Sequence, residues 1–320
     1  MGADINRQRA ARIMAERGLD ALVLAKPESF RWATGAPPGV AAFFRRAGAA
    51  LALVPADPAR PVSAVSTELF APSARAALGD NNVLTHPDWV ETADLRKWAD
   101  SPDSAAELVN RFHRNQGRAD SFIRPAAYDA SAAFAALASL LQREGLMKAR
   151  IGLDLDFWPA ADYAFLQRSI AGPDWADAGE AVSLIKAVKS PTEIAHLDRA
   201  ARLAEAGMKQ AIAAVHAGIH RDAIAEAWRD GAQTEARRLG IKLTGSWEYI
   251  TVGPLPWQGG GALQAGDVLK FDVGCLVEGY SSDSGRTYTL GSPRPRAREI
   301  MSALESAFEA GLEALRPGRL

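Results

Sequence analysis

The sequence predicts an α/β (α+β) protein of two domains, and three observations lead to this prediction. Its 320 residues exceed the roughly 250–300 residues beyond which a single hydrophobic core stops growing. Helical and strand patterns alternate through the first half of the chain. The second half contains a long amphipathic helix and a β-hairpin signature. We expect one domain in residues 1–186 and another in residues 187–320.

The first domain is expected to begin with a helix. Within residues 9–35, an amphipathic run is followed by a glycine stop, a short apolar strand and a turn. A further helical stretch covers residues 131–144, and residues 151–155 read as the strand after it. The domain should therefore alternate helices with strands.

The second domain is expected to open with a well-capped helix. Ser190, Pro191, Thr192 and Glu193 form a capping box with proline at the first helical position. Apolar residues then recur at helical spacing as far as Val215. Another helix is predicted at residues 297–315.

A β-hairpin is predicted between these helices. Residues 268–275 and 280–290 are rich in β-branched and aromatic residues, and a short segment that closes on Gly279 separates them. A turn centred between Val277 and Glu278 places Asp272 directly opposite Asp283. Alternation puts Asp272 on one face of its strand, with Lys270 and Gly274, and puts Leu269, Phe271 and Val273 on the other.

Opposed carboxylates predict a metal site. Directly opposed residues have Cβ atoms roughly 4.5–5.5 Å apart, so two carboxylates there repel unless a cation lies between them. Gly274 and Gly285 leave room beside the acids. The alternative is a solvated polar face at the edge of the sheet.

The residues from Asp272 to Thr287 resemble a known signature. They match the pattern Asp-x-Gly…Gly-Tyr-x-x-Asp-x-x-Arg-Thr of the pita-bread metallopeptidase family, which includes Xaa-Pro aminopeptidases, prolidases and creatinase. Residues 184–194 resemble the entry to that catalytic domain, and residues 9–35 resemble the start of a creatinase-type amino-terminal domain. Residues 55–145 match only in pattern.

The resemblance implies a creatinase-like amino-terminal domain followed by a pita-bread catalytic domain. It implies that Asp272 and Asp283 bind a pair of divalent metal ions and that the protein is a homodimer. Mostly oxygen ligands suit manganese better than cobalt or zinc. Arg286 is expected to anchor its strand through an ion pair, with a substrate contact as the alternative.

The remaining family ligands, a histidine and two glutamates, follow the hairpin in sequence. Here all five histidines precede it, at positions 86, 113, 196, 216 and 220. The chain stops at Leu320 in what reads as the next helix, so the catalytic domain looks cut off at its midpoint. Either the sequence is a fragment, which we expect, with further catalytic residues beyond Leu320, or it is a truncated relative.

The expected activity is hydrolysis of an amide bond by a metal-activated water, as in Xaa-Pro aminopeptidases and prolidases. Many peptidase members carry a histidine before the hairpin, where this chain offers Trp257. An indole cannot accept a proton, so Trp257 is a candidate for the substrate pocket or for the core. The open alternatives are a creatinase-like amidinohydrolase, a lyase, a cyclic-amide hydrolase or a non-catalytic dimerisation or binding module.

Composition narrows the possible partners. Thirty-seven basic and 38 acidic residues give a formal net charge of −1, which does not favour nucleic acid. No apolar run approaches the roughly 18 residues that span a bilayer, so no membrane partner is expected.

The lone cysteine, Cys275, reads as a buried packing residue in a reducing compartment. A cytoplasmic protein that acts on a small peptide or small amide metabolite is expected.

Overall fold

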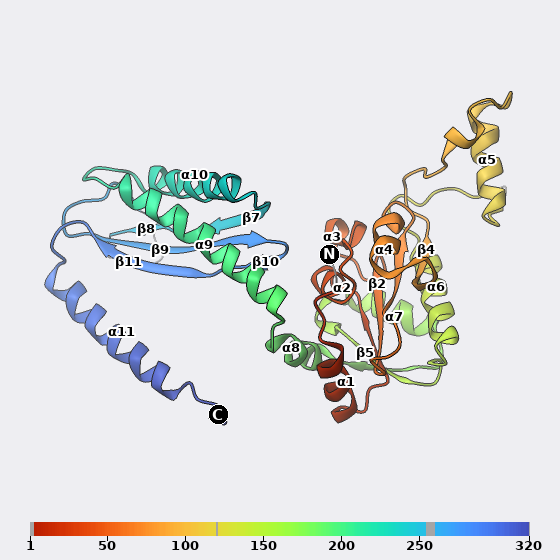
Figure 1. The fold of residues 1–320 in the computed structure, drawn as a ribbon, viewed down its shortest axis with the longest axis horizontal. Helices are drawn as coiled ribbons and strands as arrows, with labels where there is room; N and C mark the ends of the chain where they lie inside the picture. The colour runs from red at the N-terminus through yellow and green to blue at the C-terminus, as the bar shows by residue number, and fades with distance from the viewer. Residues whose placement is uncertain (1–2, 120, 254–259, 320) are drawn as a thin grey trace. The chain divides into compact units, whose positions relative to one another are not determined.

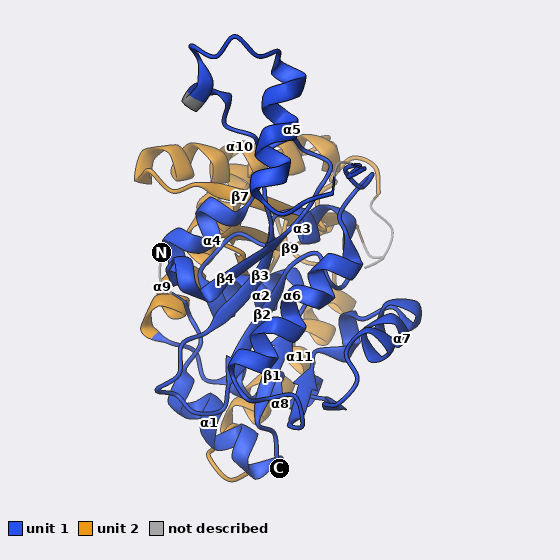
Figure 2. Cartoon of the chain, turned by 90° about the vertical axis from the view of Figure 1, so that its right-hand side faces the viewer, with its two compact units in different colours: residues 1–190 blue, residues 191–320 orange. Residues whose placement is uncertain are grey.

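The computed structural model describes residues 3–119, 121–253 and 260–319. The chain folds into two compact units, Met1–Ser190 (unit 1) and Pro191–Leu320 (unit 2), drawn in blue and orange in Figure 2. Their boundary lies four residues after the expected one. The predicted mixture of helices and strands is confirmed.

Unit 1 is a six-stranded mixed sheet in the order β4-β3-β2-β1-β5-β6, with helices on both faces (Figure 1). The pairs β1–β2 and β2–β3 are antiparallel, whereas β3–β4, β1–β5 and β5–β6 are parallel. The strands are β1 (Ala21–Leu24), β2 (Leu51–Pro55), β3 (Ser63–Thr67), β4 (Val83–His86), β5 (Arg150–Leu153) and β6 (Asp174–Asp177). The helices are α1 (Arg7–Glu16), α2 (Pro27–Thr34), α3 (Val40–Phe44), α4 (Ala71–Leu78), α5 (Ala105–Asn115), α6 (Ala130–Arg143), α7 (Ala160–Ser169) and α8 (Gly179–Ala187), with 3₁₀ turns at Asp80–Asn82, Leu95–Trp98 and Leu155–Phe157.

Two hydrophobic cores cover the two faces of this sheet. Successive residues of a strand point to opposite faces, so Leu22 belongs to the core shared with α1, α2 and α8, while Val23 belongs to the core shared with α6 and α7. All four residues of β1 are buried. This explains why residues 21–24 read as a continuous apolar run rather than an alternating one.

Most predicted elements of unit 1 are confirmed, with one correction. Helix α6 and strand β5 lie within two residues of their expected ranges, and α1 is the helix expected at the start of the domain. The turn expected before Gly35 is wrong, because this segment is the helix α2. Pro27 occupies the first helical turn, and Gly35 ends the helix in the left-handed conformation (φ 72°), as is common at helix ends.

Unit 2 is a five-stranded antiparallel sheet built around one strand, β9. On one side β9 pairs with β7 and β8, and on the other side with β10 and β11. The strands are β7 (Leu243–Glu248), β8 (Thr251–Val252), β9 (Val268–Val277), β10 (Tyr280–Ser281) and β11 (Ser284–Thr289). The helices are α9 (Pro191–Ala213), α10 (Arg221–Leu239) and α11 (Pro295–Ala314).

Helices α9 and α10 cover one face of the sheet. The buried hydrophobic residues of β9 lie at alternate positions, from Leu269 to Val277, and form a core with Leu203, Met208 and Trp228 of the two helices. The other face of β9 carries Lys270, Asp272 and Gly274, as predicted. We call it the open face of the sheet. Helix α9 begins at Pro191, as expected.

Helix α11 matches the helix predicted at residues 297–315, and none of its residues is buried. Its exposed apolar residues include Ile300, Leu304, Phe308 and Leu312, which recur every four positions. Within the described ranges, no helix is both long enough and apolar enough to span a membrane.

The tight contact between α9 and α10 at Gly207 gives a stability prediction. A Cβ added at Gly207 would lie 2.6 Å from the carbonyl oxygen of Trp228 and 2.8 Å from its indole nitrogen. Alanine gains about 1 kcal/mol of helix propensity over glycine, but overpacking costs about 1–3 kcal/mol. Since a helical carbonyl cannot move aside, we expect Gly207→Ala to lower the free energy of unfolding by about 1–2 kcal/mol, measured by urea titration with tryptophan fluorescence.

The matched control is Gly311→Ala in α11, where nothing lies within 4 Å of the added Cβ. It should be neutral or stabilising. Equal stability of the two variants would contradict the close packing of α9 on α10.

Candidate functional site

The hairpin of unit 2 carries both predicted metal ligands, but its register differs from the predicted one. Strand β11 pairs with β9 so that Gly285, rather than Asp283, lies opposite Asp272. The turn is centred between Glu278 and Gly279, one residue later than predicted. Both turn residues have positive φ, 53° and 84°, as in the type I′ turns that close two-residue hairpins. The predicted direct opposition of the two aspartates is therefore wrong.

The two aspartates nevertheless share a face. Moving the turn centre by one residue moves each cross-strand partner by two, which keeps every side chain on its side of the sheet. Asp272 and Asp283 are diagonal neighbours, which lie about 7–8 Å apart, and both are exposed. At this separation they repel less than directly opposed carboxylates would, so a cation is not needed to explain the pair.

Two aromatic residues of the preceding segment lie beside Asp272 on the open face. The backbone of Asp272 exchanges two hydrogen bonds with Tyr249, at 2.7 and 3.2 Å, and the Tyr249 side chain is 69% exposed. Trp247 lies opposite Gly274, and its ring centroid is 6.0 Å from that of Tyr249. These two rings were not predicted from the sequence. The available signal was that Trp247 and Tyr249 are two residues apart, the spacing that puts two side chains of a strand on the same face.

The turn of the hairpin is tied to the start of α9. The Tyr280 hydroxyl donates a hydrogen bond to the Glu193 carboxylate at 3.1 Å. The Tyr280 ring also stacks on His196, with centroids 5.4 Å apart and planes 13° from parallel. These contacts join the hairpin to the helix that supports the sheet.

Arg286 lies on the helix-covered side of the sheet, since it pairs with Phe271 of the buried face. Its guanidinium is 3.8 Å from Glu205 of α9, and both side chains are about half exposed. Its role as a strand anchor stays a prediction. Cys275 is buried, as expected, and burial raises the pKa of its thiol to about 12. Trp257 lies outside the described residues.

The donors present suit a hard divalent ion, because carboxylate oxygens are its preferred ligands. They are only two, however. Among the described residues, no group of three or more His, Cys, Asp or Glu side chains could hold a metal ion. His220 caps the N-terminus of α10, and His216 lies in the loop before it.

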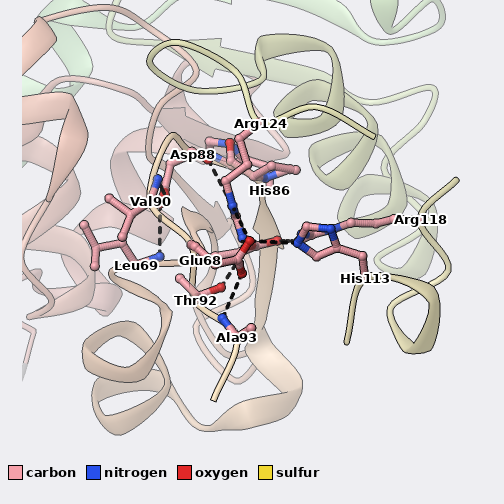
Figure 3. Close-up of polar contacts among 12 residues, drawn as sticks. Glu68, Leu69, His86, Asp88, Val90, Thr92, Ala93, His113, Arg118 and Arg124 are labelled. Carbon is pink, nitrogen blue, oxygen red and sulfur yellow. Dashed lines mark hydrogen bonds and ion pairs between the residues drawn. The ribbon is translucent and has the colours of Figure 1, made fainter. Parts of the chain in front are cut away.

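Unit 1 contains a second concentration of charged side chains, between the strands β3 and β4 and the segment 89–127 (Figure 3). Glu68 forms ion pairs with Arg118 and, at 3.2 Å, with Arg124. Glu91 pairs with Arg124 at 3.0 Å and with His113 at 2.9 Å. Because both glutamates already have arginine partners, we interpret this network as a clamp that holds the segment 89–127 rather than as a ligand site.

Two family models match the chain. Residues 6–188 match the creatinase/prolidase N-terminal domain, which is more than half of the sequence, and residues 195–320 match metallopeptidase family M24. The chain belongs to the creatinase/prolidase family of metallopeptidases. The predicted family and its two-domain fold are thereby confirmed.

The chain is similar to curated proteins and to solved structures. The chain is 25% identical to an Xaa-Pro dipeptidase of Lactobacillus helveticus over 173 residues. This alignment covers 52% of this chain and 46% of the relative. It is 41% identical over 56 residues to methionine aminopeptidase A of Synechocystis, 18% of this chain and 22% of that protein. The crystal structure of dipeptidase PepE from Mycobacterium ulcerans matches with a TM-score of 0.63 at 23% identity, over 98% of this chain and 71% of that one.

At 23% identity, the match to the dipeptidase PepE structure shows the fold alone. The chain also spans less than half the length of the curated relatives it matches. The activity and substrates of the protein are therefore treated as proposals below.

The clamp in unit 1 gives a prediction about pH. Burial raises the pKa of Glu91, but hydrogen bonds from Arg124 and from the Ala93 N–H, together with the charge of Arg124, outweigh it and hold the pKa at about 2. Because the pKa of Glu91 is lower in the folded state than in the unfolded state, its ionised carboxylate stabilises the fold. This contribution is fully present at pH values above the unfolded pKa of about 4.5, and it is lost as the pH falls toward about 2. Since Glu91 is about one-third exposed, screening reduces the contribution to about 1 kcal/mol.

Glu91→Gln should therefore be less stable than wild type at pH 7 and equally stable near pH 2, as measured by urea titration at both pH values. Glu16→Gln, the same change at an exposed position of α1, is the control in the same unit. A stability difference for Glu91→Gln that persists unchanged to pH 2 would refute the proposed pairing.

Proposed function

We propose that this chain belongs to a metal-dependent hydrolase that cleaves the amide bond of small Xaa-Pro peptides. The observation that carries the proposal is the placement of both acids in one hairpin, with Asp272 on β9 and Asp283 between β10 and β11, on the open face of the sheet. Membership of the metallopeptidase family supports the reaction class. The dipeptidases among its relatives support a small peptide substrate.

In this proposal Asp272 and Asp283 hold a pair of divalent ions, with manganese preferred. When bound, such ions lower the pKa of a coordinated water and polarise the amide carbonyl. Among the described residues, no group of three or more His, Cys, Asp or Glu side chains could hold a metal ion. In this proposal the two aspartates therefore share the ions with ligands outside the described residues.

The protein's own residues fix the orientation of these ligands. Strand pairing holds Asp272 from both sides, through the Tyr249 backbone on one edge and Gly285 on the other. Trp247 and Tyr249 offer apolar surface beside the carboxylates, against which a compact apolar substrate group can pack and exclude water. The core beneath β9 prevents the strand from shifting.

Asp272→Asn tests the assignment in the full-length protein. Loss of a direct ligand should reduce metal affinity by more than the 10–100-fold that loss of a ligand-orienting partner costs. We therefore expect no bound manganese by elemental mass spectrometry and no hydrolysis of Xaa-Pro dipeptides. Unchanged metal content would defeat the assignment.

Asp230→Asn is the matched control, since it makes the same change at an exposed position on α10. It should keep wild-type metal content and activity. Amidines, betaines and cyclic amides are assayed beside the dipeptides. Turnover of one of these by wild type, without dipeptide cleavage, would identify the chain as a non-peptidase member of the family.

Two further properties belong to the proposal. We propose a homodimer, which light scattering coupled to size exclusion tests directly. The lone buried thiol, Cys275, is consistent with a reducing compartment, and we propose the cytoplasm as the location.

A further inference from the structure

The second strand of the hairpin is interrupted immediately before Asp283. Strand β10 ends at Ser281 and β11 begins at Ser284, yet both pair with β9 in one continuous register. No residue is inserted or lost, so the interruption is not a bulge of the ordinary kind, which adds a residue to one strand. Its cause must lie in the hydrogen bonds of Ser282 and Asp283.

A side-chain hydroxyl replaces one backbone bond at this point. The Ser282 N–H donates to the Cys275 carbonyl at 3.0 Å, as in a regular ladder. The returning bond differs, because the Cys275 N–H donates to the Ser282 hydroxyl oxygen at 3.1 Å rather than to the Ser282 carbonyl. Ser282 is buried, with 6% of its surface exposed. The carbonyl of the Ser282–Asp283 peptide is thereby released from the ladder.

The released carbonyl has partners of its own. The Ser281 hydroxyl donates to it at 2.9 Å, and the Trp247 indole N–H donates to the Ser281 hydroxyl at 3.2 Å. A chain of hydrogen bonds thus runs from β7 to the peptide that precedes Asp283. These hydrogen bonds hold the peptide in its orientation, because breaking them would leave polar groups without partners.

The space for this arrangement comes from one glycine. A Cβ at Gly274 would lie 2.3 Å from the Ser282 carbonyl oxygen and 2.4 Å from the Trp247 indole. At Gly285 the nearest atom to an added Cβ is the Phe271 carbonyl oxygen, at 3.7 Å, which is an ordinary contact. The two glycines, which the sequence presents as equivalent, are therefore different: only Gly274 accommodates the turned peptide.

We propose that Ser282 is a positioning residue, which turns the Ser282–Asp283 peptide out of the ladder and so aims the Asp283 carboxylate at the metal site. The inference rests on the proposed function, since it takes Asp283 as a metal ligand. Rotating a peptide beside a ligand changes the direction of that ligand's side chain. The hydroxyl of Ser282, the space at Gly274 and the relay through Ser281 act together to hold it.

Manganese binding to the full-length protein tests the role of Ser282, with free Mn²⁺ measured by electron paramagnetic resonance. In Ser282→Ala the Cys275 N–H loses its hydroxyl acceptor and returns to the carbonyl of residue 282. We expect the dissociation constant to rise about 10–100-fold, as for partners that orient a metal ligand. Ser282→Thr keeps the hydroxyl and should restore near wild-type affinity. Ser284→Ala, the same change on the next strand, should bind as wild type does.

Asp283→Asn separates this inference from the proposed function. If Asp283→Asn loses manganese while Ser282→Ala binds it as tightly as wild type does, the positioning role is overturned and the metal assignment stands. If Asp283→Asn itself retains wild-type affinity, the proposed function fails instead.

A second pair of variants does not depend on the serine. Gly274→Ala should weaken manganese binding to a similar extent, whereas Gly285→Ala should fold with an unaltered hairpin. Crystal structures of the metal-free Ser282→Ala and Gly274→Ala proteins should show the carbonyl of residue 282 turned back toward Cys275. A carbonyl that remains over position 274 in Ser282→Ala would overturn the inference.

Discussion

The alternation of apolar and polar residues along β9 is the constraint on which unit 2 depends. This strand pairs with every other strand of its sheet, and its inward side chains form the core with α9 and α10. A slip of one residue would carry Asp272 into that core and Phe271 into solvent. Burying an unpaired carboxylate is costly. The same packing that stabilises the sheet therefore also fixes the face on which the aspartates lie.

The sequence was sufficient to predict that face but not the register of the hairpin. Period-two alternation depends only on local residues, so Asp272 was correctly assigned to the face of β9 opposite Phe271 and Val273. The register depends on the turn, and here Glu278 occupies a left-handed conformation that costs a non-glycine residue about 1–2 kcal/mol. Nothing in the local sequence marks Glu278 for that role. The hydroxyl bond of Ser282 to Cys275 was equally hidden, since it exists only once the register is set.

In unit 1, too, elements with a regular local pattern were predicted, whereas contacts between residues far apart in the sequence were not. Helix α6 and strand β5 were predicted because their patterns are long and regular, whereas α2 was missed because eight residues between a strand and a glycine resemble a turn. The clamp around Glu68 could not be predicted at all. Its arginine partners lie 50 and 56 residues further along the chain, and no periodicity links them.

The order of elements in unit 2 has a consequence for synthesis. The two helices α9 and α10 precede the strand that covers their apolar faces, and 38 residues separate Leu239 at the end of α10 from Val277 at the end of β9. At translation rates of about 5–20 residues per second, about 2–8 seconds pass between the synthesis of α10 and the completion of β9. During this interval the apolar faces of α9 and α10 that later pack on β9 have no sheet partner. The hairpin that carries Asp272 and Asp283 is therefore made only after the two helices that support it.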